Sequence, residues 1–236
     1  KLKGISKKDY ILCFISGAFL FGHYFSWFNA VKLTNVASAS VLAALHPLVV
    51  LLVTVFVYRR KVSLRSVLAI IVALLGGVLI MGADYSTFAG GNITGNIFAF
   101  FAAVFMGLYF AMGDEVRKRV DGGLYVLLVF ASCWICFIIG NIASGTELFG
   151  YRPMDYVYLI VMAFVCQIGS HAVFNMCIGH VSSLYVSTWE TADAVFATIM
   201  AVIFLGQIPE IYEAAGCIIV VGALLYYNRQ ESKNQQ

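Results

Sequence analysis

The chain has 236 residues, of which 61% are hydrophobic and only 11% are charged, and its mean hydropathy is +0.90. A soluble domain usually carries about 25% charged residues, so this composition excludes a soluble globular protein and indicates a membrane protein with several spans. The formal net charge of +3 is small, and we expect neither a nucleic-acid partner nor a cofactor. With three prolines and no low-complexity linker, the chain is predicted to form one integral domain.

Apolar segments long enough to cross the bilayer follow one another along the whole sequence. A spanning helix needs about 20 apolar residues to cross roughly 30 Å of hydrocarbon. Eight segments meet this requirement: about 9–31, 36–58, 64–83, 95–113, 122–143, 155–178, 184–206 and 211–228. Helices are predicted because a lipid-exposed strand edge would leave backbone groups unsatisfied. The fold class is therefore an all-α, polytopic membrane helical bundle.

The basic residues are distributed unequally between the loops if the chain starts in the cytoplasm. The outer side then receives only Lys32 and Arg152. The other 13 of the 15 Lys and Arg residues fall on the inner side, in the segments 1–8, 59–65, 117–119 and 229–233. The positive-inside rule therefore predicts that both termini are cytoplasmic.

An internal repeat appears when the sequence is shifted by 146 residues. Without a gap, the spans 9–31, 36–58 and 64–83 then fall on 155–177, 182–204 and 210–229. The first and sixth helices cross in opposite directions, so the two copies have opposite topology, and each repeat needs an odd number of helices. We predict that residues 1–83 hold the last three helices of the first repeat. Residues 95–229 are predicted to hold a complete second five-helix repeat.

The counterparts of the fourth and fifth helices would precede Lys1. We therefore predict that the whole protein has ten helices, of which this sequence lacks the first two. The upstream reading frame is expected to encode two further apolar spans.

Two stretches carry a resemblance to a known family. They are "AVKLTNVASASVLAALHPLVVLLVTVFVYRRKVSLRSVLAIIVALLGGVLI" (30–80) and "GHVSSLYVSTWETADAVFATIMAVIFLGQIPEIYEAAGCIIVVGALL" (179–225). Each resembles the repeat ending of the EamA-type transporters, which belong to the drug/metabolite transporter superfamily. The second stretch departs from the pattern at Asp193-Ala194, where the family often has proline. The resemblance implies a transporter of small metabolites or drugs, often an exporter, whose central cavity is lined by both repeats.

Glu190 and Asp193 are the only carboxylates that lie well inside a predicted span. An ionised group near the bilayer centre costs roughly 2.5–3.5 kcal/mol, so it normally faces a cavity, a partner or a pathway. Helix rise places the two residues about 9 and 14 Å beyond residue 184, and their i,i+3 spacing puts them on one face. We predict that both bind substrate and couple transport to protons; a structural hydrogen bond to a neighbouring helix is the alternative.

Further polar residues are candidates for a substrate site. Gln167, His171 and Asn175 form an i, i+4, i+8 stripe on the sixth helix, which serves either substrate binding or contacts between helices. Asn29 is the repeat counterpart of Asn175, with the same two readings. His46 precedes Pro47, which removes a helical hydrogen bond, and an imidazole can titrate near physiological pH.

Trp189 adjoins Glu190, and we predict that its ring lies at the cavity, where it could stack on a planar or cationic substrate. Most aromatic residues in such a chain instead belong to the core or to the interfacial belts.

The leading hypothesis for function is a secondary transporter that works by alternating access, with a small-molecule substrate and the lipid bilayer as its partners. A membrane-embedded sensor or receptor is the alternative. A membrane enzyme is less favoured, because the loops contain neither an HExxH motif nor paired acidic motifs, and we predict no enzymatic activity. A homodimer is left open.

Overall fold

The computed structural model describes residues 6–34, 36–80, 92–145, 149–178, 180–205 and 211–234. Regular structure in these residues is helical throughout, with η marking π-helical segments. The elements are α1 (Lys7–Leu33), α2 (Val36–Ala43), α3 (His46–Leu52), η2 (Val53–Val57), α4 (Leu64–Ile80), α6 (Ile93–Val116), α7 (Gly122–Ser144), α8 (Pro153–Met162), η3 (Ala163–Ala172), α9 (Val173–Ile178), α10 (Ser183–Glu190), α11 (Asp193–Leu205) and α12 (Ile211–Asn234).

The predicted helical bundle is confirmed, and each of the eight predicted spans is mainly helical where the structure describes it. Within the described residues, five stretches are long and apolar enough to cross a membrane: Lys7–Leu33, Ala39–Val57, Ile93–Val116, Gly122–Ser144 and Ile211–Gln230. Leu64–Ile80 and Pro153–Val165 are shorter apolar helices. The predicted span 184–206 is divided between α10 and α11, so it is not one continuous rod.

The chain divides into two compact units. The first comprises Lys1–Phe21 and Tyr109–Val186, and the second comprises Gly22–Leu108 and Ser187–Gln236. Helices α1, α6 and α10 each contribute residues to both units.

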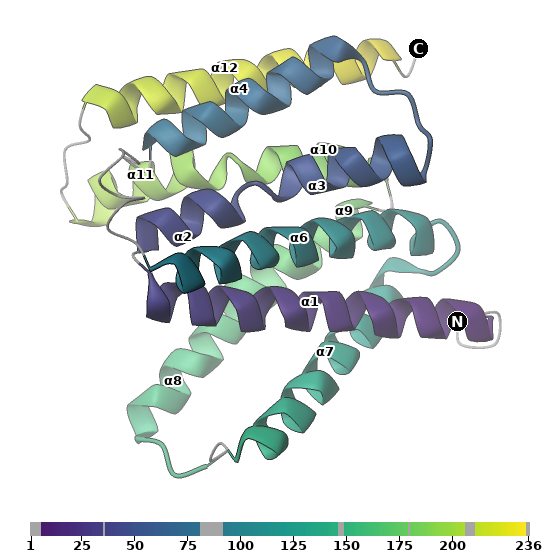
Figure 1. Ribbon diagram of the computed structural model, residues 1–236, viewed down its shortest axis with the longest axis vertical. Helices are drawn as coiled ribbons and strands as arrows, with labels where there is room; N and C mark the ends of the chain where they lie inside the picture. Colours follow the sequence, from purple (N-terminus) through teal and green to yellow (C-terminus); the bar gives the residue numbers. More distant parts are fainter. Residues whose placement is uncertain are drawn as a thin grey trace. The chain divides into compact units, whose positions relative to one another are not determined.

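In the second unit, α4 and α12 run side by side (Figure 1). Glycines allow this close approach: a Cβ on Gly76 would lie 2.9 Å from side-chain carbons of Ile219 and Val220, and one on Gly216 would lie 2.8 Å from the Gly76 carbonyl oxygen. An apolar cluster from α4, α12 and the α10–α11 region completes this core: Ala73, Ile80, Ala192, Val195, Val220, Ala223 and Leu224.

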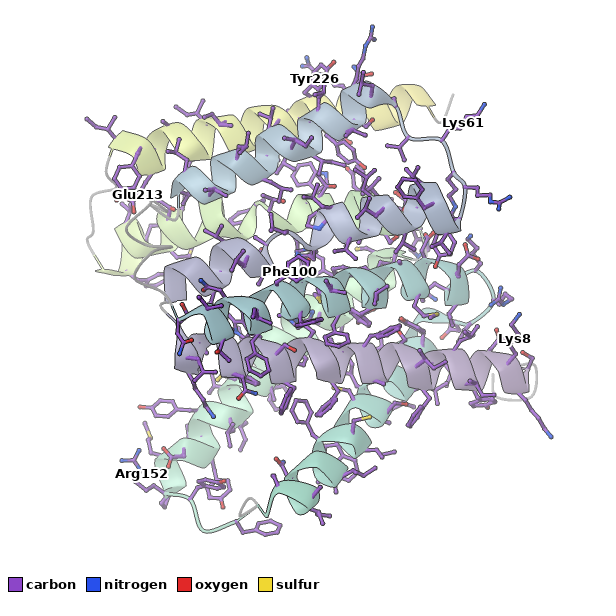
Figure 2. All side chains as sticks on the ribbon, in the orientation of Figure 1. Lys8, Lys61, Phe100, Arg152, Glu213 and Tyr226 are labelled. Atoms are coloured by element: carbon purple, nitrogen blue, oxygen red, sulfur yellow. The ribbon has the colours of Figure 1, made fainter. Side chains whose placement is uncertain are left out.

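Two labelled side chains of the second unit lie at opposite ends of its helices. Lys61, in the segment between η2 and α4, lies at one end, and Glu213, in the first turn of α12, lies at the other (Figure 2). The basic run at residues 59–61 is therefore far from the start of α12.

In the first unit, α1 packs closely against α7. A Cβ on Gly17 would lie 2.5 Å from the Val129 carbonyl oxygen, and the buried hydroxyls of Ser16 and Tyr125 are 2.7 Å apart. The ends of α7 follow from its flanking residues: the Asp121 carboxylate accepts a hydrogen bond from the Leu124 backbone N–H, and Gly145 adopts the left-handed conformation with a φ of 68°.

Candidate functional site

Two helices of the second unit are interrupted where polar residues stand. Helix α2 ends at Ala43 and α3 begins at His46, an interruption visible in Figure 1. Helix α10 ends at Glu190 and α11 begins at Asp193. The 146-residue shift carries Ala44 to residue 190, so the two interruptions stand within one residue of corresponding positions in the sequence.

The first interruption follows from Pro47. In a continuous α-helix, the N–H of residue 47 would donate to the carbonyl of Ala43, but proline has no N–H. The Nδ1 atom of His46 lies 3.2 Å from that carbonyl oxygen and takes the place of the missing donor. The proline therefore both breaks the helix and fixes the orientation of the preceding imidazole.

The second interruption forms without a proline. Thr191 N–H donates to the Thr188 carbonyl over 3.2 Å, and Ala192 N–H donates to the Trp189 carbonyl over 3.0 Å. These are i→i−3 hydrogen bonds, which tighten the last turn of α10 and end it.

The two interruptions meet at a pair of side chains. His46 Nε2 lies 2.7 Å from Glu190 Oε2, and the side chains are only 12% and 8% exposed. His46 stands ten residues after the start of α2, and Glu190 stands seven residues after the start of α10. At 1.5 Å per residue, His46 lies roughly 15 Å along its span and Glu190 roughly 10 Å along its own. In a membrane about 30 Å thick, both therefore lie between one third of the depth and the middle.

The protonation of this pair is constrained by what each ring nitrogen faces. Nδ1 faces a carbonyl oxygen and Nε2 faces a carboxyl oxygen. A carbonyl only accepts, so the Nδ1 contact requires a proton on Nδ1. The 2.7 Å distance between Nε2 and Oε2 brings the imidazole and the carboxylate within the range of an ion pair.

Asp193 has a different environment from Glu190. Its side chain is exposed and it begins α11, whereas Glu190 is buried at the end of α10. The two acids do not lie on one continuous helix, because Thr191 and Ala192 form a turn between them, so the i,i+3 relation alone does not define a shared face.

Trp189 is directed to the core. Its side chain packs against the apolar cluster of α4, α11 and α12. In this conformation the ring completes helix packing in the second unit.

Helix α10 buries more polar groups than the sequence reasoning recognised. Ser187, Thr188 and Thr191 are at most 8% exposed, as is Ser183 at the start of the helix. Ser183, Ser187 and Glu190 follow an i, i+4, i+7 spacing, which is the signal of one polar helical face. That spacing was present in the sequence and would have identified the buried polar side of α10.

In the first unit, Asn175 forms a separate polar centre. It is 1% exposed; its Nδ2 donates to Tyr109 Oη and, over 2.6 Å, to the His171 carbonyl oxygen. Arg117 Nε donates to the Asn175 carbonyl oxygen over 3.3 Å, and Nη1 of the same residue donates to the Val120 carbonyl over 2.8 Å. Both amide donors of Asn175 are thus used within the protein, and Arg117 caps the end of α9.

The predicted stripe on the sixth helix has a different geometry. Gln167 and His171 lie in the π-helical segment η3, whereas Asn175 lies in α9. A π-helix has a wider turn than an α-helix, so the i, i+4, i+8 spacing does not define one face across this junction. His171 is half-buried, and the Gln167 side chain lies outside the described ones.

Asn29, in the second unit, bonds within its own helix: its Nδ2 donates to the Phe25 carbonyl over 2.7 Å.

Among the described residues, no group of three or more His, Cys, Asp or Glu side chains could hold a metal ion. The His46–Glu190 pair is therefore the most distinctive titratable arrangement within the described part of the second unit.

Comparison with known proteins places this geometry in a family. Residues 1–82 and 93–229 match the EamA-like transporter family. An uncharacterized transporter of Clostridium kluyveri is 24% identical over 87% of this chain and 68% of its own length. An uncharacterized transporter of Bacillus subtilis is 25% identical over 97% of this chain and 74% of its own.

A further relative is GDP-fucose transporter 1 of Dictyostelium discoideum, 27% identical over 76% of this chain and 50% of its own length. A solved crystal structure shares the fold, with a TM-score of 0.76 and 18% identity over 94% of this chain and 78% of its own. The family match covers most of the sequence, and the helical bundle agrees with it. The chain is an integral membrane protein that belongs to the EamA-like transporter family.

Proposed function

We propose that this membrane transporter is a secondary transporter that exports a small metabolite, amino acid or drug by alternating access, coupled to protons through Glu190. The observation that carries the proposal is the 2.7 Å contact between His46 and Glu190, which joins two interrupted helices. Transporters commonly bind substrate and coupling ions where helices are discontinuous, near the middle of the membrane. Ionisable groups at such depth are costly unless they serve a pathway or a partner.

The repeat organisation is part of the proposal. The family matches in two stretches, 1–82 and 93–229, which supports one repeat ending near residue 83 and a second spanning 95–229. Alternating access then consists of one repeat rocking against the other. The basic loops support cytoplasmic termini, and the bacterial relatives support a bacterial plasma membrane.

The charges near the site bear on the class of substrate. A nucleotide sugar, as carried by the Dictyostelium relative, has a diphosphate that would need cationic partners. Among the described residues, Lys and Arg lie in loops or near helix ends, and the site itself offers Glu190, Asp193 and one imidazole. A substrate without phosphate groups fits this environment better.

The proposal is tested by reconstitution of the intact protein in liposomes loaded with a mixed metabolite extract. A pH gradient is imposed, and mass spectrometry identifies the compounds that cross. Selective loss of one compound class, relative to protein-free liposomes, supports a transporter of that class. If nothing crosses while the protein is verifiably folded, the proposed function fails, and binding without translocation would point to a sensor.

A further inference from the structure

We propose that the segment 59–65, together with the neighbouring end of α12, binds the phosphate headgroup of an acidic phospholipid. The inference goes beyond the proposed function, because it concerns a membrane lipid rather than the transported compound. It follows from a difference between the two runs of three basic residues, 59–61 and 117–119. The second run is partnered within the protein, and the first is not.

The run 117–119 is neutralised or bonded within the first unit. Lys118 Nζ lies 2.6 Å from Glu115 Oε1, and Arg119 Nε lies 3.0 Å from Asp9 Oδ1. Arg117 donates to backbone carbonyls at the end of α9 and in its own loop. This loop therefore offers little unbalanced charge to a ligand.

The segment 59–65 has a different environment. Arg59, Lys61 and Arg65 are exposed. Within the described residues, none of these three side chains forms an ion pair or a hydrogen bond. Their charges are therefore available to a partner outside the protein.

Helix α12 brings a further cation to this end of the second unit. Gly76 lies against Val220, and Gly216 lies against Ile80, so α4 and α12 are antiparallel. The last turns of α12 therefore accompany the first turns of α4. Arg229 stands in this part of α12 and is exposed.

Carboxylates in the sequence do not balance these charges. No Asp or Glu stands between residues 10 and 83, and the last turns of α12 contain one, Glu231. One carboxylate leaves most of the positive charge at this end of the second unit uncompensated. The end therefore attracts an anion.

Two of the cations stand where the backbone favours another residue. Arg59 has a φ of 53°, in the left-handed region that glycine adopts most readily. The turn that it makes lets the Arg60 N–H donate to the Thr54 carbonyl over 3.0 Å, which satisfies a carbonyl of η2. Arg65 lies in the first turn of α4, where the partial positive charge of the helix favours an acid. Both positions keep a cation at a local cost, which indicates a role for the charge itself.

Apolar residues around the run favour a lipid over a soluble anion. Phe56, Val57 and Leu64 are 74%, 67% and 73% exposed. The cations follow directly after the apolar stretch Ala39–Val57, so in a membrane they lie at the level of the headgroups. Basic segments next to a span are attracted to acidic lipids, and a guanidinium binds phosphate through parallel N–H donors.

The substitution Arg59→Gly separates lipid binding from folding. Glycine adopts the left-handed conformation without strain, so the stability of the protein should be kept or rise while one cation is lost. Each Lys or Arg near an acidic lipid surface strengthens the attraction about fivefold, so Arg59→Gly should weaken binding of an acidic lipid about fivefold.

A triple variant removes the exposed charges together. It carries Arg59→Gln, Lys61→Gln and Arg65→Gln, and it should bind acidic and neutral lipids about equally. Arg60 is left unchanged, because its guanidinium lies 5.1 Å from the centre of the Tyr58 ring. The matched control is Lys118→Gln, which removes a cation that Glu115 already neutralises and should not change lipid binding.

The measurement is native mass spectrometry of the intact, delipidated protein in detergent. Phosphatidylglycerol or phosphatidylcholine is added, and the protein molecules with bound lipid are counted at each lipid concentration. The wild type should bind phosphatidylglycerol at least tenfold more tightly than phosphatidylcholine, and an excess of inorganic phosphate should not displace it.

Three results would overturn the inference. The first is equal affinity of the wild type for the two lipids, which needs no variant to fold. The second is a preference for phosphatidylglycerol that Arg59→Gly and the triple variant leave unchanged. The third is displacement of phosphatidylglycerol by inorganic phosphate, which would show a site for free phosphate. The assay contains no transported substrate, so its outcome is independent of the proposed function.

Discussion

The energetic link between His46 and Glu190 can be measured with a double-mutant cycle. The variants are His46→Ala, Glu190→Ala and the double substitution. Removing Glu190 takes away the carboxylate that lies 2.7 Å from Nε2 of a buried ring, and residues in direct contact show interaction energies of about 0.5–3 kcal/mol. Each side chain keeps about a tenth of its surface exposed, so water partly replaces the lost partner and lowers the free-energy cost of removing it. We therefore expect a coupling energy of about 1–3 kcal/mol, in the range of residues in direct contact.

The assay is reversible denaturation in mixed micelles, with the free energy of unfolding of all four proteins measured at one pH. Glu190→Gln provides an intermediate point: its amide can still donate to Nε2, so it should cost only about 1 kcal/mol. His23 gives a matched control, because its Nδ1 contacts the Ala102 carbonyl at 2.9 Å, and its substitution should be additive with Glu190→Ala. A His46–Glu190 coupling energy no larger than that of the His23 control would refute the pairing.

Three other substitutions test the packing that holds the site. Gly76→Val should destabilise the α4–α12 pair by about 1–3 kcal/mol because of overpacking, whereas Gly222→Ala, with open space around it, should be neutral or slightly stabilising in denaturation experiments. Equal effects of the two would contradict the glycine contact. Arg119→Ala removes the 3.0 Å ion pair with Asp9 and, because Arg119 is half exposed, should change the free energy of unfolding little; a large loss of stability would contradict this expectation. Trp189→Phe should keep transport but lower the unfolding temperature by a few degrees, and selective loss of transport would instead return Trp189 to the substrate site.

The positions of the spans were predictable from the sequence because crossing the bilayer requires about 20 apolar residues, whatever their neighbours. The interruption before Pro47 was also signalled, since proline cannot donate a helical hydrogen bond. The interruption after Glu190 was not, because it contains no proline. It depends on i→i−3 bonds and on a pairing with His46, which lies far away in the sequence.

The candidate site was predicted in part. Local reasoning singled out His46 and Glu190 separately, but their contact depends on how α3 and α10 pack within the second unit. The same reasoning treated Asp193 as equivalent to Glu190, because it assumed a continuous helix. For Asn175, the amide pattern identified a buried polar position, but only the fold shows that Tyr109 and a backbone carbonyl use its donors.

The proposed function requires Glu190 to exchange the proton that drives transport. It is tested most directly by measuring gradient-driven substrate accumulation in liposomes containing wild-type protein, Glu190→Gln or Asp193→Asn. We predict that Glu190→Gln abolishes accumulation above equilibrium while substrate still exchanges across the membrane. Asp193→Asn should keep gradient-driven accumulation. Full gradient-driven accumulation by Glu190→Gln would contradict the account.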